Sequence, residues 1–498
     1  MKKNMHAGRK VSTAFSFFIL SIFASQCFAQ SSTSSDRTNT FQYLKKLNSV
    51  FEFVQKNYVD EVDPKVLYEG AMKGLMNSLE DPYTSYLDES TMRDLSDTTN
   101  GNFGGVGLYI SKPVESKPGK PAYVEISSPM EDTPGAKAGI LAGDYITEID
   151  GKPTAPMTMQ EVLSNLRGEV GTPVQIKILR GKNLTFTVDL VRALIEVPTV
   201  KYGMIGNTGY MRLIQFTPDT PVRVQEALDS FKKDQKFKNL IIDLRDNPGG
   251  LITSAVDVAD KFIDDGPIVT TKSRLDFENT TYKANPDNTK VRNIPIVVII
   301  NQGSASASEI LSGALKDNHL AYLIGQRSYG KGSVQQVIPL GKDEEIKMTM
   351  ARYYTPSDTN IDKIGIPPDQ EIAYPKLTEE NEKTYASLIE SNAIANYVEN
   401  HPDMTEEQIA SFADELKKNY SLDIRLLRRL VRIQATRTKP TALYDLDYDI
   451  QLKAALELLD KTKDFKSLVK KTKTLKELQQ EAEKEKAKAE NEKKEKAE

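Results

Sequence analysis

Three short apolar runs constrain the fold of this chain more than any other feature. They occupy residues 240–244, 294–300 and 321–324. Continuous apolar runs without polar alternation are typical of strands that are buried on both faces, as in a parallel sheet. Helical segments near 252–262 and 306–315 separate them, and parallel strands need such crossover connections. Residues 194–372 are therefore predicted to form an α/β core.

Composition places the chain among soluble globular proteins of several domains. Its 498 residues are 27% charged and 39% hydrophobic, which is ordinary for that class. A net charge of −4 gives no reason to expect a nucleic-acid partner, because such proteins carry a basic surface.

The N-terminus has the pattern of a secretory signal peptide, predicted here as residues 1–29. Basic residues precede an apolar run at 14–24, and the motif Cys27-Phe28-Ala29 follows it. Cleavage is expected after Ala29. The run is short for a membrane span, so no integral membrane anchor is expected in the mature form. Cys27 is the only cysteine, so the mature protein is expected to lack disulfides. The predicted location is exported, with the periplasm preferred over the cell envelope or secretion.

Helical regions are predicted on both sides of the central part of the chain. Apolar residues recur at helical spacing within residues 30–98, for example Leu44, Leu47 and Val54. Residues 373–466 form a second helical region, and 467–498 a Lys/Glu-rich tail that is read as a solvated helix or a disordered extension. These terminal helices also offer a surface for homo-oligomerisation.

Residues 99–193 are predicted to form a separate β-rich domain. Alternating segments at 123–127, 145–150, 174–180 and 184–190 read as strands, and 157–166 as a helix. A glycine-rich loop containing Gly105, Val106, Gly107 and Leu108 leads into the domain. Glycines let several backbone N–H groups converge without side-chain obstruction, so this loop is a candidate for binding a carboxylate.

Ser306 lies where the strand at 295–300 gives way to a helix, within the motif GSASASE at 303–309. One reading is structural, because Ser306 and Glu309 fit the S-x-x-E capping box. The other reading is a nucleophile, because a helix N-terminus and the N–H of Ala307 favour an adjacent negative charge. Ser304 and Ser308 are the alternative serines.

A serine nucleophile needs a base, and Lys331 follows Ser306 by 25 positions. A lysine serves if its pKa falls from about 10.4 to about 7–8. The flanking Gly330 and Gly332 leave room for its approach. If a strand starts at Lys331, Gln335 shares its face. A neutral amide would orient the ammonium without the charge stabilisation that a carboxylate gives.

An oxyanion hole needs two converging donors, and two loops offer them. The N–H of Ala307 is one candidate. The second lies in the motif DNPGG at 246–250, which follows the strand at 240–244. Glycine permits close approach of backbone to substrate, so either Gly249 or Gly250 is a candidate donor.

Two other site types compete with this reading. Residues 325–331 match the start of a P-loop, but Gly332 stands where Ser or Thr should bind magnesium, and 334–340 reads as a strand. A Ser-His-Asp site would need one of the three histidines of the chain. Of these, His319 follows the Ser306 helix and is interpreted as structural. The chain has no H-E-x-x-H motif, so a zinc enzyme is not expected.

The motifs GSASASE and YGKGSVQ (329–335), in this order, resemble those of the C-terminal processing (tail-specific) peptidases, which are serine proteases with a lysine base. Residues 128–151 and 166–174 resemble a PDZ domain. The resemblance spans about 41–369, and His319 and Asp358 depart from the usual arginine and glycine. It selects Ser306 as nucleophile, Lys331 as base and Gln335 as its support.

The resemblance implies an exported serine endopeptidase that recognises the free, apolar C-terminal tail of protein substrates through its PDZ domain. Neither a metal nor an organic cofactor is required. The expected fold is multidomain α/β and α+β, with an α/β protease core, an inserted PDZ-like β-rich domain and helical N- and C-terminal regions. The alternative is a catalytically silent PDZ adaptor or scaffold in the envelope.

Overall fold

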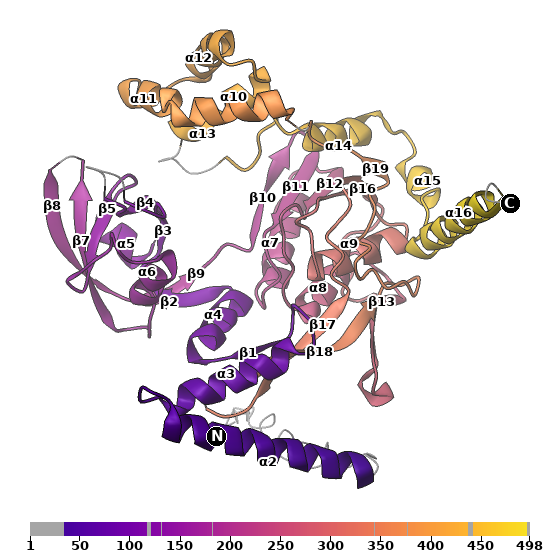
Figure 1. Ribbon diagram of the computed structural model, residues 1–498. Helices are drawn as coiled ribbons and strands as arrows, with labels where there is room; N and C mark the ends of the chain where they lie inside the picture. Colours follow the sequence, from indigo (N-terminus) through magenta and orange to yellow (C-terminus); the bar gives the residue numbers. More distant parts are fainter. Residues whose placement is uncertain are drawn as a thin grey trace, which may run out of the picture. The chain divides into compact units, whose positions relative to one another are not determined.

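A computed structural model describes residues 34–495 except 117–120, 131, 182, 343, 376 and 437–441 (Figure 1). The predicted signal peptide lies outside the described residues. The chain divides into two compact units, Met1–Pro82 and Tyr83–Glu498. Helices and strands follow largely the predicted order, and the fold is mixed α/β with helical N- and C-terminal parts.

The described part of the first unit is helical, as predicted. It contains α2 (Ser34–Asn57) and α3 (Pro64–Asn77). Asp63 caps α3 by accepting the Lys65 N–H, and Pro64 occupies the first turn, where no amide hydrogen is needed. Leu44 and Leu47 on α2 are exposed. Among the described residues, no helix combines the length and the apolar character needed to cross a bilayer.

A six-stranded sheet forms the centre of the second unit. Its strands, in spatial order, are β10 (Val200–Ile205), β11 (Thr208–Leu213), β12 (Asn239–Asp243), β15 (Ile296–Ile300), β16 (Tyr322–Gly325) and β19 (Gln370–Glu371). Only β10 runs antiparallel to its neighbour. Every residue of β12 and β15 is buried. The apolar runs therefore form adjacent parallel strands, as predicted.

Helices cover both faces of this sheet, because each strand sends alternate side chains to opposite sides. Leu240 and Ile242 pack on one face with α7 (Thr220–Lys233), α8 (Ile252–Ala259) and α9 (Ala307–Asp317). Ile241 and its neighbours pack on the other face against α14 (Ile450–Lys461) and α15 (Phe465–Lys470). The C-terminal helices thus complete the α/β core.

The charged tail is helical, but its beginning is packed rather than solvated. It forms α15 and α16 (Leu475–Glu495). Val469 is buried in the core beneath the sheet, and Leu475 in the core around α9. The Leu475 N–H also donates to Asp317 Oδ1 at 2.8 Å. Apolar side chains at these positions explain why a tail of high average charge docks at its start.

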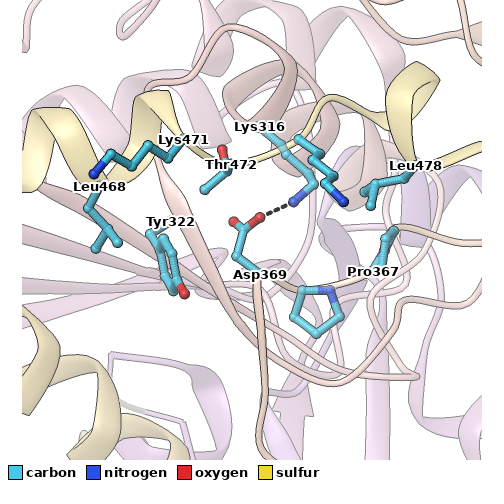
Figure 2. A pocket seen from close by; sticks show the side chains of 10 residues that line it. Lys316, Tyr322, Pro367, Asp369, Leu468, Lys471, Thr472 and Leu478 are labelled. Atoms are coloured by element: carbon cyan, nitrogen blue, oxygen red, sulfur yellow. Dashed lines mark hydrogen bonds and ion pairs between the residues drawn. The ribbon is translucent and has the colours of Figure 1, made fainter. Parts of the chain in front are cut away.

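A buried ion pair joins α9 to the strands beside it (Figure 2). Lys316 on α9 pairs with Asp369, and their side chains are 1% and 7% exposed. Asp369 Oδ2 also accepts the Leu323 N–H of β16 at 2.8 Å. The pair lies beside a cavity of about 330 Å³ that α15 and α16 help to line. It therefore fixes the helix that begins at Ser306 to the sheet.

Replacing Asp369 with alanine is expected to lower the free energy of unfolding by about 3 kcal/mol, because Lys316 would remain buried without its counter-charge. The double variant Lys316→Met/Asp369→Leu should recover most of that loss, since no charge stays buried. Urea denaturation measures both. A loss below about 1 kcal/mol in Asp369→Ala would mean that water reaches the lysine.

A second sheet lies beside the first and is wholly antiparallel. Its order is β1 (Ser85–Leu87), β18 (Glu345–Tyr354), β13 (Pro267–Ser273) and β14 (Thr280–Lys283), and β17 (Ser333–Pro339) also pairs with β18. A 3₁₀ turn, η1 (Asp276–Glu278), joins β13 to β14. The loop carrying Lys331 connects β16 of the first sheet to β17 of the second.

The PDZ region is inserted between paired strands. After α4 (Glu89–Asn100), the strand β2 (Asn102–Gly105) enters and pairs with the exit strand β9 (Ala193–Glu196). Between them lie β3 (Leu108–Ser111), β4 (Val124–Pro129), β5 (Tyr145–Ile149), β7 (Pro173–Arg180) and β8 (Leu184–Val191), with β6 (Lys152–Pro153) beside β5. The helices are α5 (Pro134–Lys137) and α6 (Met159–Leu166), and a Thr158–Glu161 capping box starts α6.

Four helices after the core form a module with its own apolar centre. They are α10 (Glu379–Glu390), α11 (Ala393–Asn400), α12 (Glu406–Asn419) and α13 (Ile424–Ala435). Leu388, Phe412 and Leu427 are among its buried residues. The Tyr397 ring stacks on Phe412, with centroids 3.6 Å apart. The predicted C-terminal helical region therefore contains this module as well as α14.

Candidate active site

The predicted nucleophile, base and oxyanion-hole residues lie on or beside three loops that follow the carboxyl ends of β12, β15 and β16, whereas Gln335 lies on β17. These strands are neighbours and parallel, and ligands of such sheets bind at this edge. Hydrogen bonds tie the loops together. The Ala305 N–H donates to the Asn247 carbonyl at 3.0 Å, and the Tyr329 N–H to the Ser304 carbonyl at 3.0 Å. The fold thus gathers the segments that sequence separates.

Ser306 stands on a sharp turn between β15 and α9. Its φ is 55° and its ψ −114°, and its side chain is largely buried. This backbone conformation is costly for a residue with a Cβ, so surrounding contacts must hold it. Strained turns of this kind recur at functional residues.

The two alternative serines have structural partners. Ser304 Oγ donates to the Leu244 carbonyl at 2.8 Å, and Ser308 Oγ to the Asn247 carbonyl at 2.9 Å. Both residues are fully buried. Their hydroxyls therefore hold the nucleophile loop against the loop after β12, which distinguishes them from Ser306.

A single carboxylate joins the predicted nucleophile to the predicted base. Glu309 Oε2 accepts the Ser306 N–H at 2.8 Å and the Lys331 N–H at 2.9 Å. Its Oε1 accepts Ser328 Oγ at 2.6 Å and the Gly330 N–H at 2.7 Å. Burial raises the pKa of Glu309, although these hydrogen bonds oppose the rise. The sequence indicated Glu309 only as a capping residue.

Tyr353 links the backbone carbonyl groups of Ser306 and Lys331. Its hydroxyl donates to the Lys331 carbonyl and, at 3.3 Å, to the Ser306 carbonyl. Burial, followed by the charge of Glu309, raises the pKa of Tyr353 well above its ordinary value. The phenol therefore stays protonated and remains a donor. Ser306 and Lys331 are thus bridged through both their amide nitrogens and their carbonyl oxygens.

Lys331 lies on a loop rather than on a strand. β17 begins at Ser333, and its pairing with β18 shifts between Val334 and Gln335. The expectation that Lys331 and Gln335 share one strand face required a strand that starts at Lys331, and that condition is wrong. The Lys331 ammonium lies over the Tyr83 ring, 4.7 Å from its centroid.

The amide of Gln335 is held within the second sheet. Its Nε2 donates to Ser333 Oγ at 2.9 Å and to Thr349 Oγ1 at 3.2 Å. Gly332, which precedes β17, allows the backbone at Asp362 to approach closely. A Cβ there would lie 2.6 Å from the Asp362 nitrogen. The glycines beside Lys331 therefore make room for another loop, a reason that the sequence did not indicate.

The loop after β12 lies directly against Ser306. A Cβ on Gly249 would meet the Ser306 Cβ at 2.8 Å and the Ala307 nitrogen at 2.9 Å. The Gly249 N–H donates to Asn247 Oδ1 at 2.9 Å. In the part of the chain that the structure describes, the N–H groups of Ala307 and Gly250 have no protein acceptor. Asn247, fully buried, is a positioning residue that the sequence reading passed over.

Replacing Gly249 with alanine is expected to reduce kcat by roughly 100-fold, because the new Cβ displaces Ser306 from its position. The φ of Gly249 is 104°, so strain of about 1–3 kcal/mol should also lower stability. Gly181→Ala is the matched control, since its φ of 62° is also positive but nothing lies within 4 Å. Steady-state kinetics would contradict the expectation if both variants kept wild-type kcat.

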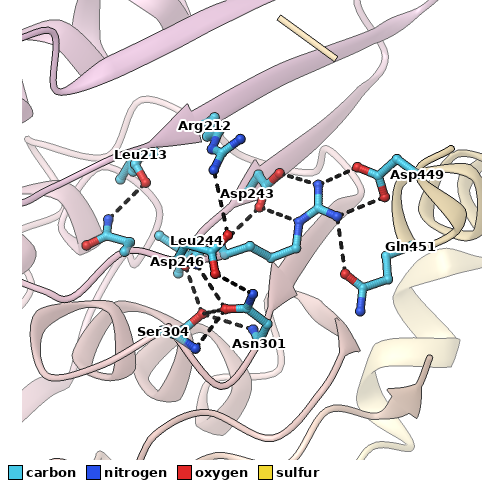
Figure 3. A network of polar contacts seen from close by, with 12 residues as sticks. Arg212, Leu213, Asp243, Leu244, Asp246, Asn301, Ser304, Asp449 and Gln451 are labelled. Carbon is cyan, nitrogen blue, oxygen red and sulfur yellow. Dashed lines mark hydrogen bonds and ion pairs between the residues drawn. The ribbon is translucent and has the colours of Figure 1, made fainter. Parts of the chain in front are cut away.

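Arg245 fixes the same loop to the C-terminal part of the chain. Its guanidinium pairs at 2.6 Å with each of two carboxylates, that of Asp243 and that of Asp449 at the N-terminus of α14. Figure 3 labels these two acidic residues. Farther along, Asp246 and Asn301 exchange hydrogen bonds of 2.9 and 2.8 Å. The loop after β12 is therefore fixed both to the nucleophile loop and to a helix more than 200 residues away in sequence.

The predicted carboxylate-binding loop lines a groove of the PDZ region. Gly105, Val106, Gly107 and Leu108 all border a cavity of about 210 Å³, together with Met159, Leu163 and Leu166 of α6. β3 is the edge strand of its sheet. A Cβ on Gly107 would lie 2.2 Å from the Thr133 side chain, so only glycine fits.

Arg167 and His319 occupy distinct places. Arg167 lines the PDZ groove, with its guanidinium 4.6 Å from the centroid of the Phe103 ring. His319 follows the far end of α9, where its Nδ1 lies 3.3 Å from the Val469 carbonyl. An 11-residue helix is about 16 Å long, which separates His319 from Ser306.

A serine on a strained strand-to-helix turn with a lysine bridged to it is an arrangement that suits a serine peptidase. Sequence comparison assigns the family. Residues 207–372 match the model of peptidase family S41, residues 125–180 match a PDZ domain, and residues 10–91 match the N-terminal domain of the activating protease CtpB.

Individual relatives agree. The carboxy-terminal-processing protease of Bartonella bacilliformis is 41% identical over 367 residues, which cover 72% of this chain and 82% of that protein. The carboxy-terminal processing protease CtpA of Bacillus subtilis is 32% identical over 347 residues, covering 69% and 72%. The solved structure of a photosystem II D1 C-terminal processing protease is 29% identical, with a TM-score of 0.41 and coverage of 66% and 92%. The two sequence relatives show that this chain belongs to the carboxy-terminal-processing serine proteases of family S41.

Proposed function

We propose that this protein is an exported endopeptidase that binds the C-terminal tail of a protein substrate and cuts it with Ser306 and Lys331. The observation that carries the proposal is the double bridge between these residues. Glu309 Oε2 accepts both amide hydrogens, and the Tyr353 hydroxyl donates to both carbonyls. Backbones linked in this way keep a fixed relation, which nucleophile activation requires.

In the proposed reaction, neutral Lys331 takes the proton from Ser306 Oγ as the oxygen attacks the scissile carbonyl carbon. The resulting oxyanion accepts the Ala307 N–H and one N–H of the Gly249–Gly250 pair. Gly249 lies closest to Ser306 but shares its N–H with Asn247, whereas the Gly250 N–H has no protein acceptor among the described residues. Both glycines remain candidates.

The second half of the reaction uses the same groups. The lysine ammonium protonates the leaving amine, which leaves an acyl ester on Ser306. Lys331, again neutral, then deprotonates a water molecule that attacks this ester. The ester bond to Ser306 Oγ breaks, the lysine ammonium returns its proton to that oxygen, and the product acid departs. Gln335 Nε2 is occupied by Ser333 and Thr349, so its oxygen is the atom proposed to orient the ammonium. The reaction requires neither a metal nor an organic cofactor.

The PDZ groove supplies the proposed substrate choice. An extended tail would add as a strand to the open edge of β3 and place its carboxylate on the N–H groups of residues 105–108. Met159, Leu163 and Leu166 make that groove apolar, which suits an apolar last residue. Export rests on the basic and apolar pattern before Ala29. The exposed apolar stripe of α2 is proposed to support homo-oligomers.

A poorly folded substrate with an apolar C-terminus tests this function when it is offered as the free acid and as the amide. Wild-type enzyme should cut the free acid much faster, and Ser306→Ala should cut neither. Equal cutting of both forms would remove the carboxylate-capture step and keep the protease. Tail binding without any cutting by the wild type would favour the silent adaptor.

A further inference from the structure

The segment that opens the second unit reaches the side chain of the proposed base. Tyr83 is the first residue of that unit, and the Lys331 Nζ lies 4.7 Å from its ring centroid. An ammonium over the face of an aromatic ring at this distance is attracted by the ring quadrupole. The backbone of Lys331 is fixed by Glu309 and Tyr353, and the ring of Tyr83 contacts its charged end.

Thr84, the next residue, is linked by hydrogen bonds to Gln335, the residue proposed to orient Lys331. Thr84 Oγ1 accepts the Thr349 N–H at 3.1 Å, and Thr349 Oγ1 accepts Gln335 Nε2 at 3.2 Å. Thr84 is buried, and β1 follows it immediately, paired with β18 from Ser85 to Leu87. Tyr83 therefore contacts Lys331 directly, and Thr84 is linked to Gln335 through Thr349. Both residues immediately precede β1, which is paired with β18.

A lysine base needs such a partner for two reasons. Its side chain has four rotatable bonds, so fixing the backbone does not fix the amine. Its charge also appears during the reaction, because the amine becomes an ammonium as Ser306 attacks. A ring face that attracts the ammonium more strongly than the neutral amine stabilises that transition state.

We propose that Tyr83 is a positioning residue for catalysis, whose ring face holds the amine of Lys331 and stabilises its charged form during acylation. This inference rests on the proposed assignment of Lys331 as the base. Thr84 supports it by fixing Tyr83 to the strand that also carries Thr349, the partner of Gln335. The hydroxyl of Tyr83 is not needed for the effect.

Kinetics of Tyr83→Phe and Tyr83→Leu test the proposal with a saturable peptide substrate. The phenylalanine variant keeps the ring face and should stay close to the wild-type kcat. The leucine variant should lose between about 2-fold and 30-fold in kcat, the range expected of a cation–π contact, with KM little changed. A phenylalanine variant as slow as the leucine variant would overturn the proposal.

Fluorinated phenylalanines at position 83 separate electrostatics from packing. Stepwise fluorination weakens the negative ring face while the side chain keeps nearly the same shape, so these variants should fold alike. We expect kcat to fall progressively with each added fluorine. A constant kcat across the series would show that the ring acts only by filling space, and would refute the stabilisation of charge.

Tyr86→Leu and Lys331→Ala complete the set. Tyr86 lies on β1, is buried and donates to Glu344 at 2.7 Å, so its loss disturbs the same strand without touching the lysine. It should lower thermal stability but keep the kcat of folded enzyme. An equal loss of kcat in Tyr86→Leu and Tyr83→Leu would contradict a specific role of Tyr83. Activity retained in Lys331→Ala would instead refute the base assignment itself.

Discussion

Replacing Ser306 with alanine is expected to reduce kcat by roughly 10⁴-fold or more, the scale seen when a serine nucleophile is removed. Substrate binding should survive, because the PDZ groove is built from other elements. Lys331→Ala should cost a similar factor, and the double variant little more, since a nucleophile and its base act as one unit. Single-turnover cleavage of a tail peptide measures all three.

The neighbouring serines provide the control for this series. Ser304→Ala and Ser308→Ala each remove a buried hydroxyl that donates to a backbone carbonyl. Each should lower stability by about 1–3 kcal/mol while the folded enzyme still cuts. Retained cleavage in Ser306→Ala, or cleavage abolished only in Ser304→Ala, would move the nucleophile elsewhere.

Glu309→Ala is expected to have the largest effect on stability and to abolish activity as well. The change leaves four donors without their acceptor, from Ser306, Ser328, Gly330 and Lys331, of which the first three are buried and the last is half-buried. At about 1–3 kcal/mol for each unsatisfied group, the loss should exceed about 4 kcal/mol. Urea denaturation gives the stability, and assays at low temperature on the folded fraction give kcat.

Glu309→Gln refines this expectation through its pH dependence. Because burial raises the pKa of Glu309 above its ordinary value, ionisation of this carboxyl opposes folding. Its contribution to stability is therefore fully present below about pH 4.3 and is lost as the pH rises through the folded pKa. As the pH rises through the folded pKa of Glu309, the unfolding free energy of the wild type should therefore fall relative to that of Glu309→Gln. A difference independent of pH would contradict the raised pKa.

Strand patterns carried most of the fold prediction. The buried runs at β12, β15 and β16 could be recognised because most of their residues are apolar, although β12 ends on Asp243. The helices that cover the second face of the sheet were not predicted, because Leu452 and Val469 lie far away in sequence, in a C-terminal region that was read as polar. The helices that connect the strands cover only one face of this parallel sheet, and the other face must also be covered. This rule could have predicted that the C-terminal helices pack on that second face.

Prediction of the site had a different limit. Ser306 and Lys331 came from motif spacing and family resemblance, and the structure links their backbones. The S-x-x-E pattern indicated the contact of Glu309 with the Ser306 N–H, but no local pattern reveals its contact with Lys331 or the contacts of Tyr353. The face shared by Lys331 and Gln335 was expected from ideal strand periodicity, and the later start and irregular pairing of β17 remove that periodicity.

Intact-protein mass spectrometry of the acyl-enzyme tests the central claim most directly. A tail peptide ester acylates faster than an amide, so a quenched reaction should trap the ester intermediate. The account predicts a mass increase equal to the acyl fragment, located by digestion on Ser306 and missing in Ser306→Ala and Lys331→Ala. An adduct on Ser304 or on any other residue, or steady cleavage with no adduct, would contradict it.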